Sequence, residues 1–364
     1  MLEVRSDDMS KPNIRKDAQS TSGSSAVSRR AIMRSGAALG SAAVAGATAA
    51  AFGQAGDPRD RGAAAAPDTR VRSVKRYAMK KSINMWAFPY PDRMSLDECF
   101  ALAKRAGFDG IEVNYDIKDD ISPDASEDQL RAIGRRARDA GIAVSGVCSF
   151  LFWPYCPTSN DPAIRARGGE LAAKMVRAAR LLGTENLLIV PGAVHIPWYP
   201  QHEPVDYTTA LQRADQFVRR LIPLAERERV YLNIENIFMN GFLLSPDDMT
   251  RFVDSFASDR VRVHFDTGNI MQFQFPEHWV PVLGKRIKNI HFKEFTKKGT
   301  DVSIESFRPL LDGTTNWPGV IEALDAIGYD GYLTFEYFHP FPHYPEALIH
   351  QASDALDRML GRPA

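Results

Sequence analysis

Residues 230–269 read VYLNIENIFMNGFLLSPDDMTRFVDSFASDRVRVHFDTGN. The stretch opens with a short apolar run at 230–235, continues with a helical pattern at 246–257, and closes with a second short run at 261–266. Ser245 stands where an N-cap would introduce the helix. A strand, a helix and a strand in this order predict parallel strands joined by a right-handed crossover.

The same alternation repeats from residue 80 to the end of the chain. The predicted strands are 80–86, 109–113, 142–147, 186–191, 230–235, 261–266, 287–292 and 331–336. Helical patterns lie near 95–106, 126–140, 163–182, 208–228, 246–257, 276–284, 316–327 and 344–360, and Gly107, Gly141, Gly183 and Gly328 mark helix ends. Eight such units fit a closed (β/α)₈ barrel or an open doubly wound sheet. An open sheet would favour a glycine-rich phosphate turn after the first strand, and none follows Ala87. The sequence therefore predicts a single-domain α/β TIM barrel over residues 79–364.

The N-terminal segment carries a targeting pattern. Residues 1–27 are polar, and Arg29 and Arg30 precede a weakly apolar Ala/Gly-rich stretch at 37–52. This pattern resembles a twin-arginine export signal. We therefore expect a disordered N-terminus and signal over 1–55, a linker over 56–78, and a periplasmic or extracellular location. An uncleaved tether and a low-complexity tail are the alternatives. No stable membrane insertion is expected, because spanning takes about 20 strongly apolar residues.

Charge and cysteine content exclude some classes of protein. Hydrophobic residues make up 44% and charged residues 25%, as in soluble globular proteins, and 45 basic residues balance 45 acidic ones. A nucleic-acid-binding protein would more often show a basic excess, so no nucleic-acid partner is expected. Cys99, Cys148 and Cys156 are too few for a disulfide framework. They are expected to be buried thiols, with a Cys148–Cys156 bridge as the alternative outside the cytoplasm.

Four ligand-type residues end the last four predicted strands. They are Glu235, Asp266, His291 and Glu336. Strand ends of consecutive units converge on one rim of a barrel, where barrel active sites lie. Taken singly, such a carboxylate often caps the next helix, but four in succession are hard to explain in that way. Three carboxylates and one imidazole suit Mn²⁺ best, with Mg²⁺, Co²⁺ or Zn²⁺ as alternatives.

Several stretches resemble the sugar phosphate isomerase/epimerase superfamily of xylose isomerase-like barrels. They are GFDGIEV (107–113), LNIEN (232–236), HFDTGN (264–269), NIHFKE (289–294) and GYDGYLTFEYF (328–338). The resemblance implies that Glu235, Asp266, His291 and Glu336 hold one divalent ion. It further implies that the two glutamates act as the acid/base pair. It covers about residues 80–361 and does not select a substrate.

The chemistry also follows from the residue types. A metal on a ketose carbonyl and its neighbouring hydroxyl stabilises an enediolate, while Glu235 and Glu336 remove and return a proton. The chain departs from the ketose 3-epimerases at Asn269, where they often have histidine, and at Lys297, where they usually have arginine. DTGN is nearer to the pentulose-phosphate 3-epimerase pattern. Three-zinc nucleases of the superfamily need more histidines than His195 and His264 supply.

Three further residues are predicted to bind substrate, namely His195, Lys293 and Glu112. The alternative for His195 is a loop-structural role, and the alternative for Lys293 is a salt bridge to Glu235 or Glu112. Glu112 could bind sugar hydroxyls or pair with that lysine. Aromatic residues that could stack on a sugar fall in the predicted rim loops: Trp86, Phe88, Trp153 and Trp198.

The sequence as a whole predicts a metal-dependent isomerase or epimerase of a sugar or keto-sugar, with a small carbohydrate as its partner. Export would favour a substrate without phosphate, because phosphorylated sugars are mostly cytoplasmic. Two alternatives stay open: a lyase or hydrolase acting on a keto-sugar at the same site, and a non-catalytic sugar-binding barrel. A homo-oligomer is compatible with the sequence.

Overall fold

A computed structural model of the chain describes residues 71–199, 201–238, 241–298 and 303–363. The predicted signal at 1–55 and the linker up to residue 70 lie outside these residues. The described end of the predicted linker packs on the barrel: the Ser73 amide donates to Arg358 O (2.9 Å), and the Tyr77 amide donates to Leu360 O (3.1 Å).

Eight parallel strands form a closed barrel in the order β1-β10-β7-β6-β5-β4-β3-β2. Its strands are β1 Lys80–Asn84, β2 Gly110–Asn114, β3 Ala143–Cys148, β4 Asn186–Ile189, β5 Tyr231–Glu235, β6 Val261–Asp266, β7 Ile287–Phe292 and β10 Tyr332–Phe335. The barrel closes where β1 pairs with β10, for example Lys81 beside Leu333. The predicted TIM barrel is therefore confirmed.

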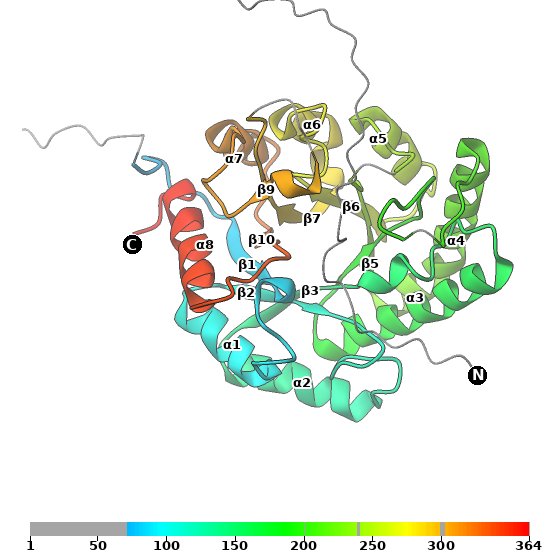
Figure 1. The fold of residues 1–364 in the computed structure, drawn as a ribbon, viewed down its shortest axis with the longest axis horizontal. Helices are drawn as coiled ribbons and strands as arrows, with labels where there is room; N and C mark the ends of the chain where they lie inside the picture. The colour runs from blue at the N-terminus through cyan, green and yellow to red at the C-terminus, as the bar shows by residue number, and fades with distance from the viewer. Residues whose placement is uncertain (1–70, 200, 239–240, 299–302, 364) are drawn as a thin grey trace, which may run out of the picture. The chain divides into compact units, whose positions relative to one another are not determined.

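The helices surround this ring of strands, with α1 and α2 on one side and α5 to α7 on the opposite side (Figure 1). They are α1 Leu96–Arg105, α2 Glu127–Asp139, α3 Pro162–Leu182, α4 Tyr207–Glu228, α5 Pro246–Asp254, α6 Pro276–Leu283, α7 Trp317–Ala326 and α8 Glu346–Met359. Ser245 caps α5 as predicted, and Ser95 caps α1 in the same way, since each hydroxyl accepts a backbone N–H of the first turn. Gly183 ends α3 at a φ of 90°, a conformation that side chains disfavour.

The loop after β7 has secondary structure of its own. It contains a two-stranded antiparallel sheet made of β8 Glu294–Phe295 and β9 Phe307–Arg308. The Glu294 carboxylate organises this loop, because it accepts hydrogen bonds from Trp317 Nε1 (2.6 Å) and Thr315 Oγ1 (2.6 Å). Two-residue strands are too short to produce an alternation in the sequence.

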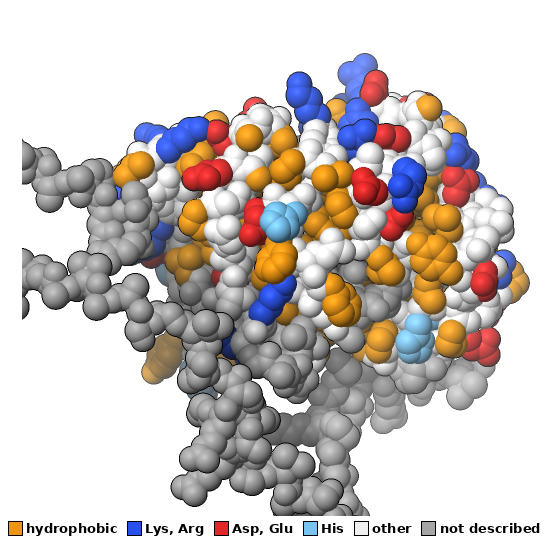
Figure 2. Space-filling view, turned by 90° about the horizontal axis from the view of Figure 1, so that it is seen from above, with side chains coloured by type: hydrophobic (Ala, Val, Ile, Leu, Met, Phe, Trp, Pro, Cys, Tyr) orange, Lys and Arg blue, Asp and Glu red, His pale blue; other side chains and the backbone are white. Residues whose placement is uncertain are grey.

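The surface charge and the state of the cysteines can be compared with what the composition predicted. Acidic and basic side chains are intermixed on one face (Figure 2). Cys99, Cys148 and Cys156 are buried free thiols, so the alternative Cys148–Cys156 bridge is not formed. None of the described helices is long and apolar enough to cross a membrane.

Candidate metal centre and active site

The four predicted ligands lie together at the C-terminal ends of four neighbouring strands. Glu235 and Asp266 are the last residues of β5 and β6, His291 is the fifth of six in β7, and Glu336 directly follows β10. His291 Nδ1 lies 3.3 Å from Glu235 Oε1, 3.3 Å from Glu336 Oε1 and 3.9 Å from Asp266 Oδ2. All four side chains are buried. The structure thus brings together residues that are up to 101 positions apart (336 − 235).

The donor atoms of this cluster fit a divalent cation. Among the described residues, His291 Nδ1 is buried without a hydrogen-bond partner, and the buried Asp266 Oδ2 forms an ion pair with Lys293 Nζ. His291 Nε2 is engaged with a carboxylate at 2.6 Å, so in the neutral ring it carries the proton and Nδ1 carries the lone pair. A lone pair 3.3 Å from carboxylate oxygens is unfavourable unless a cation or a proton lies between them. Oxygen-rich sets with one imidazole suit Mn²⁺, Mg²⁺ or Co²⁺.

The pKa shifts within the cluster also indicate a site that attracts positive charge. Burial raises the pKa of Glu235 and of Asp266, since each carboxylate loses its hydration without full compensation. Burial alone would lower the pKa of His291, but the charges of Glu336 and Glu112 outweigh it and hold that pKa well above the ordinary value. The site therefore attracts positive charge, either as protons or as a cation.

Lys293 lies against the ligand set. Its Nζ is 2.9 Å from Asp266 Oδ2, contacts Glu336 Oε2, and donates to Asn269 Oδ1 at 3.3 Å. Although burial lowers the pKa of this lysine, the charges of Asp266 and Glu336 raise it above its usual range. The sequence suggested a salt bridge from Lys293 to Glu235 or Glu112. The structure instead pairs Lys293 with Asp266 and Glu336. The ammonium remains within the cluster, in contact with two of the four predicted ligands.

Glu112 lies beneath His291 and is fully buried. Its Oε2 contacts His291 Nε2 at 2.6 Å and accepts a hydrogen bond from Asn84 Nδ2 at 2.8 Å. A Cβ added at Gly146 would lie 2.9 Å from Glu112 Oε1, so glycine there leaves room for the carboxylate. The sequence suggested that Glu112 binds sugar hydroxyls or pairs with Lys293. The structure instead pairs it with His291, an arrangement that fixes the ring orientation of a ligating histidine.

Asp266 is oriented by its own turn. Its Oδ1 accepts the amides of Gly268 (2.8 Å) and Asn269 (2.9 Å), which leaves Oδ2 to face His291. The Asn236 side chain accepts from the Asp266 amide (2.9 Å) and donates to the Asp266 carbonyl (2.8 Å). Sequence reasoning missed Asn236, although LNIEN placed it directly after a predicted ligand.

The other residues considered in the sequence, His195, His264 and Lys297, lie in three different environments. His195 lies in the loop after β4 and is exposed, and no hydrogen bond or ion pair of the described residues joins it to the ligand set. His264 is fully buried, with its ring 4.1 Å from that of His291. Lys297 turns away, since its Nζ donates to Gln274 O at 2.8 Å.

Aromatic side chains stand beside the lysine of the site. Lys293 Nζ lies 4.9 Å from the ring centres of Phe307 and Phe338, and Phe338 packs on Trp86 at 5.0 Å. Trp153 and Trp198 pack edge to face at 5.1 Å. Phe88, by contrast, is buried in the hydrophobic core. Trp198 is among the exposed large hydrophobic residues, so part of this aromatic surface is open to solvent.

The family of the chain follows from comparison with known proteins. A family model described as xylose isomerase-like TIM barrel matches residues 100–359, and the chain belongs to this family. It is 26% identical over 248 residues to a putative L-ribulose-5-phosphate 3-epimerase of Escherichia coli K12, covering 67% of this chain and 84% of that protein. It is 23% identical over 272 residues to an L-ribulose-5-phosphate 3-epimerase of Escherichia coli O1:K1, covering 73% and 91%. The solved structure of an L-ribulose 3-epimerase superposes with a TM-score of 0.64 at 19% identity, covering 78% of this chain and 95% of that one. The homologues are thus sugar epimerases, which supports a sugar isomerase or epimerase, and the structural likeness shows the fold.

Proposed function

We propose that this protein is a divalent-metal-dependent sugar isomerase or epimerase. The observation that carries the proposal is His291 Nδ1, which has no hydrogen-bond partner in the part of the chain that the structure describes and faces the carboxylates of Glu235, Asp266 and Glu336. These four residues would hold the ion. A bound divalent cation would act as a Lewis acid on a substrate carbonyl and make the neighbouring C–H more acidic.

Glu235 and Glu336 are the two carboxylates proposed to move that proton. Glu235 and Glu336 approach His291 Nδ1 from two different strands, β5 and the end of β10. Glu336 also contacts the Lys293 ammonium, whereas Glu235 contacts His291 and burial raises its pKa. Environments that differ in this way suit an acid/base pair, in which one group removes the proton and the other returns it.

Lys293 and the aromatic residues are proposed to position the substrate. The buried ammonium can bind a substrate oxygen that gains negative charge as the proton leaves. Phe338 and Trp86 offer apolar faces to the carbon side of a sugar. The role of His195 stays a prediction, and Glu112 is proposed to position His291 instead of contacting the substrate.

Solvent isotope exchange tests the reaction. Ketoses and keto-sugars are incubated with the protein and Mn²⁺ in deuterated water and followed by NMR, with the wild type and the variants Glu235→Gln and Glu336→Gln compared. We expect deuterium at the carbon next to the carbonyl, and a loss of about 10²–10⁴-fold in exchange rate for each variant, as for the loss of a general acid or base. Irreversible loss of a leaving group would indicate the lyase reaction. Binding without exchange across the panel would favour the sugar-binding barrel.

Metal content tests the site separately from the reaction. The protein is purified, stripped with a chelator and titrated with Mn²⁺, Mg²⁺, Co²⁺ and Zn²⁺ by calorimetry. We expect one ion per chain, with Mn²⁺ bound well, and a large loss of affinity in Asp266→Asn. If that variant binds as tightly as the wild type, these four residues do not hold the ion.

We further propose that the chain is exported by the twin-arginine route and acts on a sugar without phosphate. Support comes from Arg29 and Arg30 ahead of the Ala/Gly-rich stretch at 37–52. Fractionation of cells expressing the full chain should place the protein outside the cytoplasm. A double variant with lysine at both arginine positions should remain inside.

A further inference from the structure

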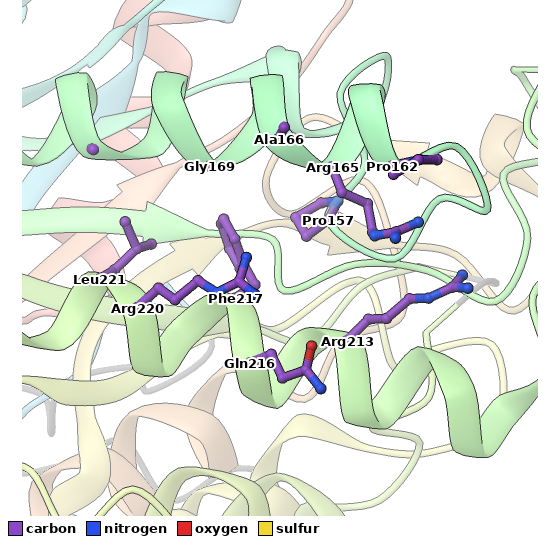
Figure 3. A pocket seen from close by; sticks show the side chains of 11 residues that line it. Pro157, Pro162, Arg165, Ala166, Gly169, Arg213, Gln216, Phe217, Arg220 and Leu221 are labelled. Carbon is purple, nitrogen blue, oxygen red and sulfur yellow. The ribbon is translucent and has the colours of Figure 1, made fainter.

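A groove of about 390 Å³ lies between α3 and α4, in the helical layer outside the barrel. Figure 3 shows its side chains projecting from two facing helices, with the Phe217 ring and the apolar Leu221 on one wall. Along α4, Arg213, Phe217 and Arg220 are three or four residues apart, so they share one helix face. The groove has the size of a small-molecule site.

The groove has a strong excess of positive charge. Arg165, Arg213 and Arg220 line it, and no carboxylate is among the described residues of its lining. No ion pair of the described residues involves these three arginines, whereas Arg167 on α3 and Arg219 on α4 pair with neighbouring carboxylates. Three guanidinium groups in one concavity raise the local concentration of anions.

Two of the arginines are already fixed in place. Arg165 Nη1 donates to Ser159 O at 2.6 Å, and Arg213 Nη1 donates to Thr158 O at 2.9 Å. Each uses one nitrogen to hold the loop before α3, and the rest of its guanidinium remains for a ligand. A ligand would therefore lose little affinity to the ordering of these side chains. Planar guanidinium groups bind carboxylate and phosphate through paired N–H donors.

A glycine keeps the groove open. Gly168 and Gly169 are adjacent in α3, and glycine in a helix interior costs about 0.5–1 kcal/mol relative to alanine. Gly168 is required by packing, because a Cβ there would lie 2.3 Å from Tyr155 O. A Cβ on Gly169 would have nothing within 4 Å, and Gly169 lines the groove. Packing does not explain Gly169, but an open binding volume does.

We propose that the groove between α3 and α4 binds a small molecule with an anionic oxygen group, a carboxylate or a phosphate, held by Arg165, Arg213 and Arg220. The apolar wall formed by Phe217 and Leu221 would contact the carbon body of the ligand. This site is separate from the four residues proposed to hold the metal, and it does not depend on the proposed reaction.

Calorimetric titration at fixed ionic strength tests the site, with inorganic phosphate and D-glucuronate as probes of the two groups. The full chain is compared with Arg220→Gln, which removes a guanidinium that holds no loop, and with Gly169→Leu, which fills the groove. Arg227→Gln is the matched control, since Arg227 lies on the same helix outside the groove.

We expect one of the probes to bind at millimolar concentration or tighter, about tenfold more weakly in Arg220→Gln and in Gly169→Leu, and unchanged in Arg227→Gln. The probe that binds identifies the group. The proposal is overturned if neither probe binds, or if the groove variants bind like the wild type. Equal weakening in the control would also overturn it, because the effect would then be general charge attraction. Far-UV circular dichroism of each variant shows whether a loss reflects unfolding.

Discussion

Replacing Glu112 with glutamine should weaken metal binding about tenfold without unfolding the barrel. Glu112 Oε2 contacts His291 Nε2 at 2.6 Å and accepts from Asn84 Nδ2 at 2.8 Å. A glutamine carbonyl in that place can accept both bonds. Its NH₂ group would face the Asn289 side chain, whose buried Oδ1 has no partner among the described residues and can accept after an amide flip. The variant therefore mainly removes a charge.

The magnitude follows from the loss of that charge. A hydrogen bond to an ionised group stabilises by about 1.5–3 kcal/mol, and a neutral one by about 0.5–1.5 kcal/mol. The two ranges differ by about 1–1.5 kcal/mol, and about 1.4 kcal/mol corresponds to a tenfold change in affinity. This is the lower end of the roughly 10–100-fold losses seen when the partner of a ligating histidine is changed.

Calorimetry with Mn²⁺ on chelator-stripped protein measures the effect, and thermal unfolding in the absence of metal monitors the fold. Glu185→Gln is the control, because it removes an exposed carboxylate that pairs with Lys288 at 2.9 Å. An unchanged Mn²⁺ affinity in Glu112→Gln would refute the role assigned to the Glu112–His291 pair. A parallel loss in Glu185→Gln would show that the effect is only the overall charge of the protein.

Three further predictions concern stability. Burial and the neighbouring Asp116 raise the pKa of Asp119 to about 6, so the folded protein binds a proton there that the unfolded chain releases more easily. This contribution to stability is present below the ordinary aspartate pKa and is lost as the pH rises through about 6. Asp119→Asn should therefore raise the unfolding free energy by about 1 kcal/mol at pH 8, but not at pH 4, in denaturant titrations. Burial lowers the pKa of His264 well below its ordinary value, and neither ring nitrogen has a partner among the described residues. His264→Leu should stabilise the metal-free protein by about 1 kcal/mol in the same titrations, and a clear loss of stability would show that a buried water satisfies the ring. In thermal unfolding, Gly168→Ala should lower Tm because its Cβ meets Tyr155 O at 2.3 Å, whereas Gly169→Ala should raise it; equal shifts would contradict the packing assigned to α3.

The fold could be predicted from the sequence because the local signals agree with one another. The run at 261–266 and the helical pattern beginning after Ser245 are long enough to show their periods, and the structure has β6 and α5 there. The pair β8 and β9 could not be predicted. Two-residue strands have no period, and they depend on long-range contacts such as those of Glu294 with Thr315 and Trp317.

The convergence of Glu235, Asp266, His291 and Glu336 could be predicted because strand ends of a barrel meet on one rim. The side chains that contact these four residues could not be predicted. Glu112 lies on β2 and His291 on β7, which are not neighbours in the sheet, so their contact crosses the barrel interior. Strand alternation indicates that Glu112 points inward, but it does not indicate which opposing side chain meets it. Lys293 was placed in the site correctly, yet its contacts with Asp266 and Glu336 depend on side-chain conformation.

The polar interior of this barrel is best understood as a support for the site. Barrel interiors of this kind are usually filled by branched apolar side chains. Here Ser82 and Ser145 hydrogen-bond at 2.6 Å, Asn186 Nδ2 donates to Ser145 O at 2.9 Å, and Asn233 Nδ2 donates to Asn186 Oδ1 at 3.2 Å. Asn84, two residues after Ser82 on β1, extends these polar contacts to the site, since its Nδ2 donates to Glu112 Oε2 at 2.8 Å. An apolar residue in its place would leave that buried oxygen with His291 Nε2 as its one partner among the described residues. The polar side chains inside the barrel thus lead to the Glu112–His291 pair, which sets the direction of His291 Nδ1 toward the three carboxylates.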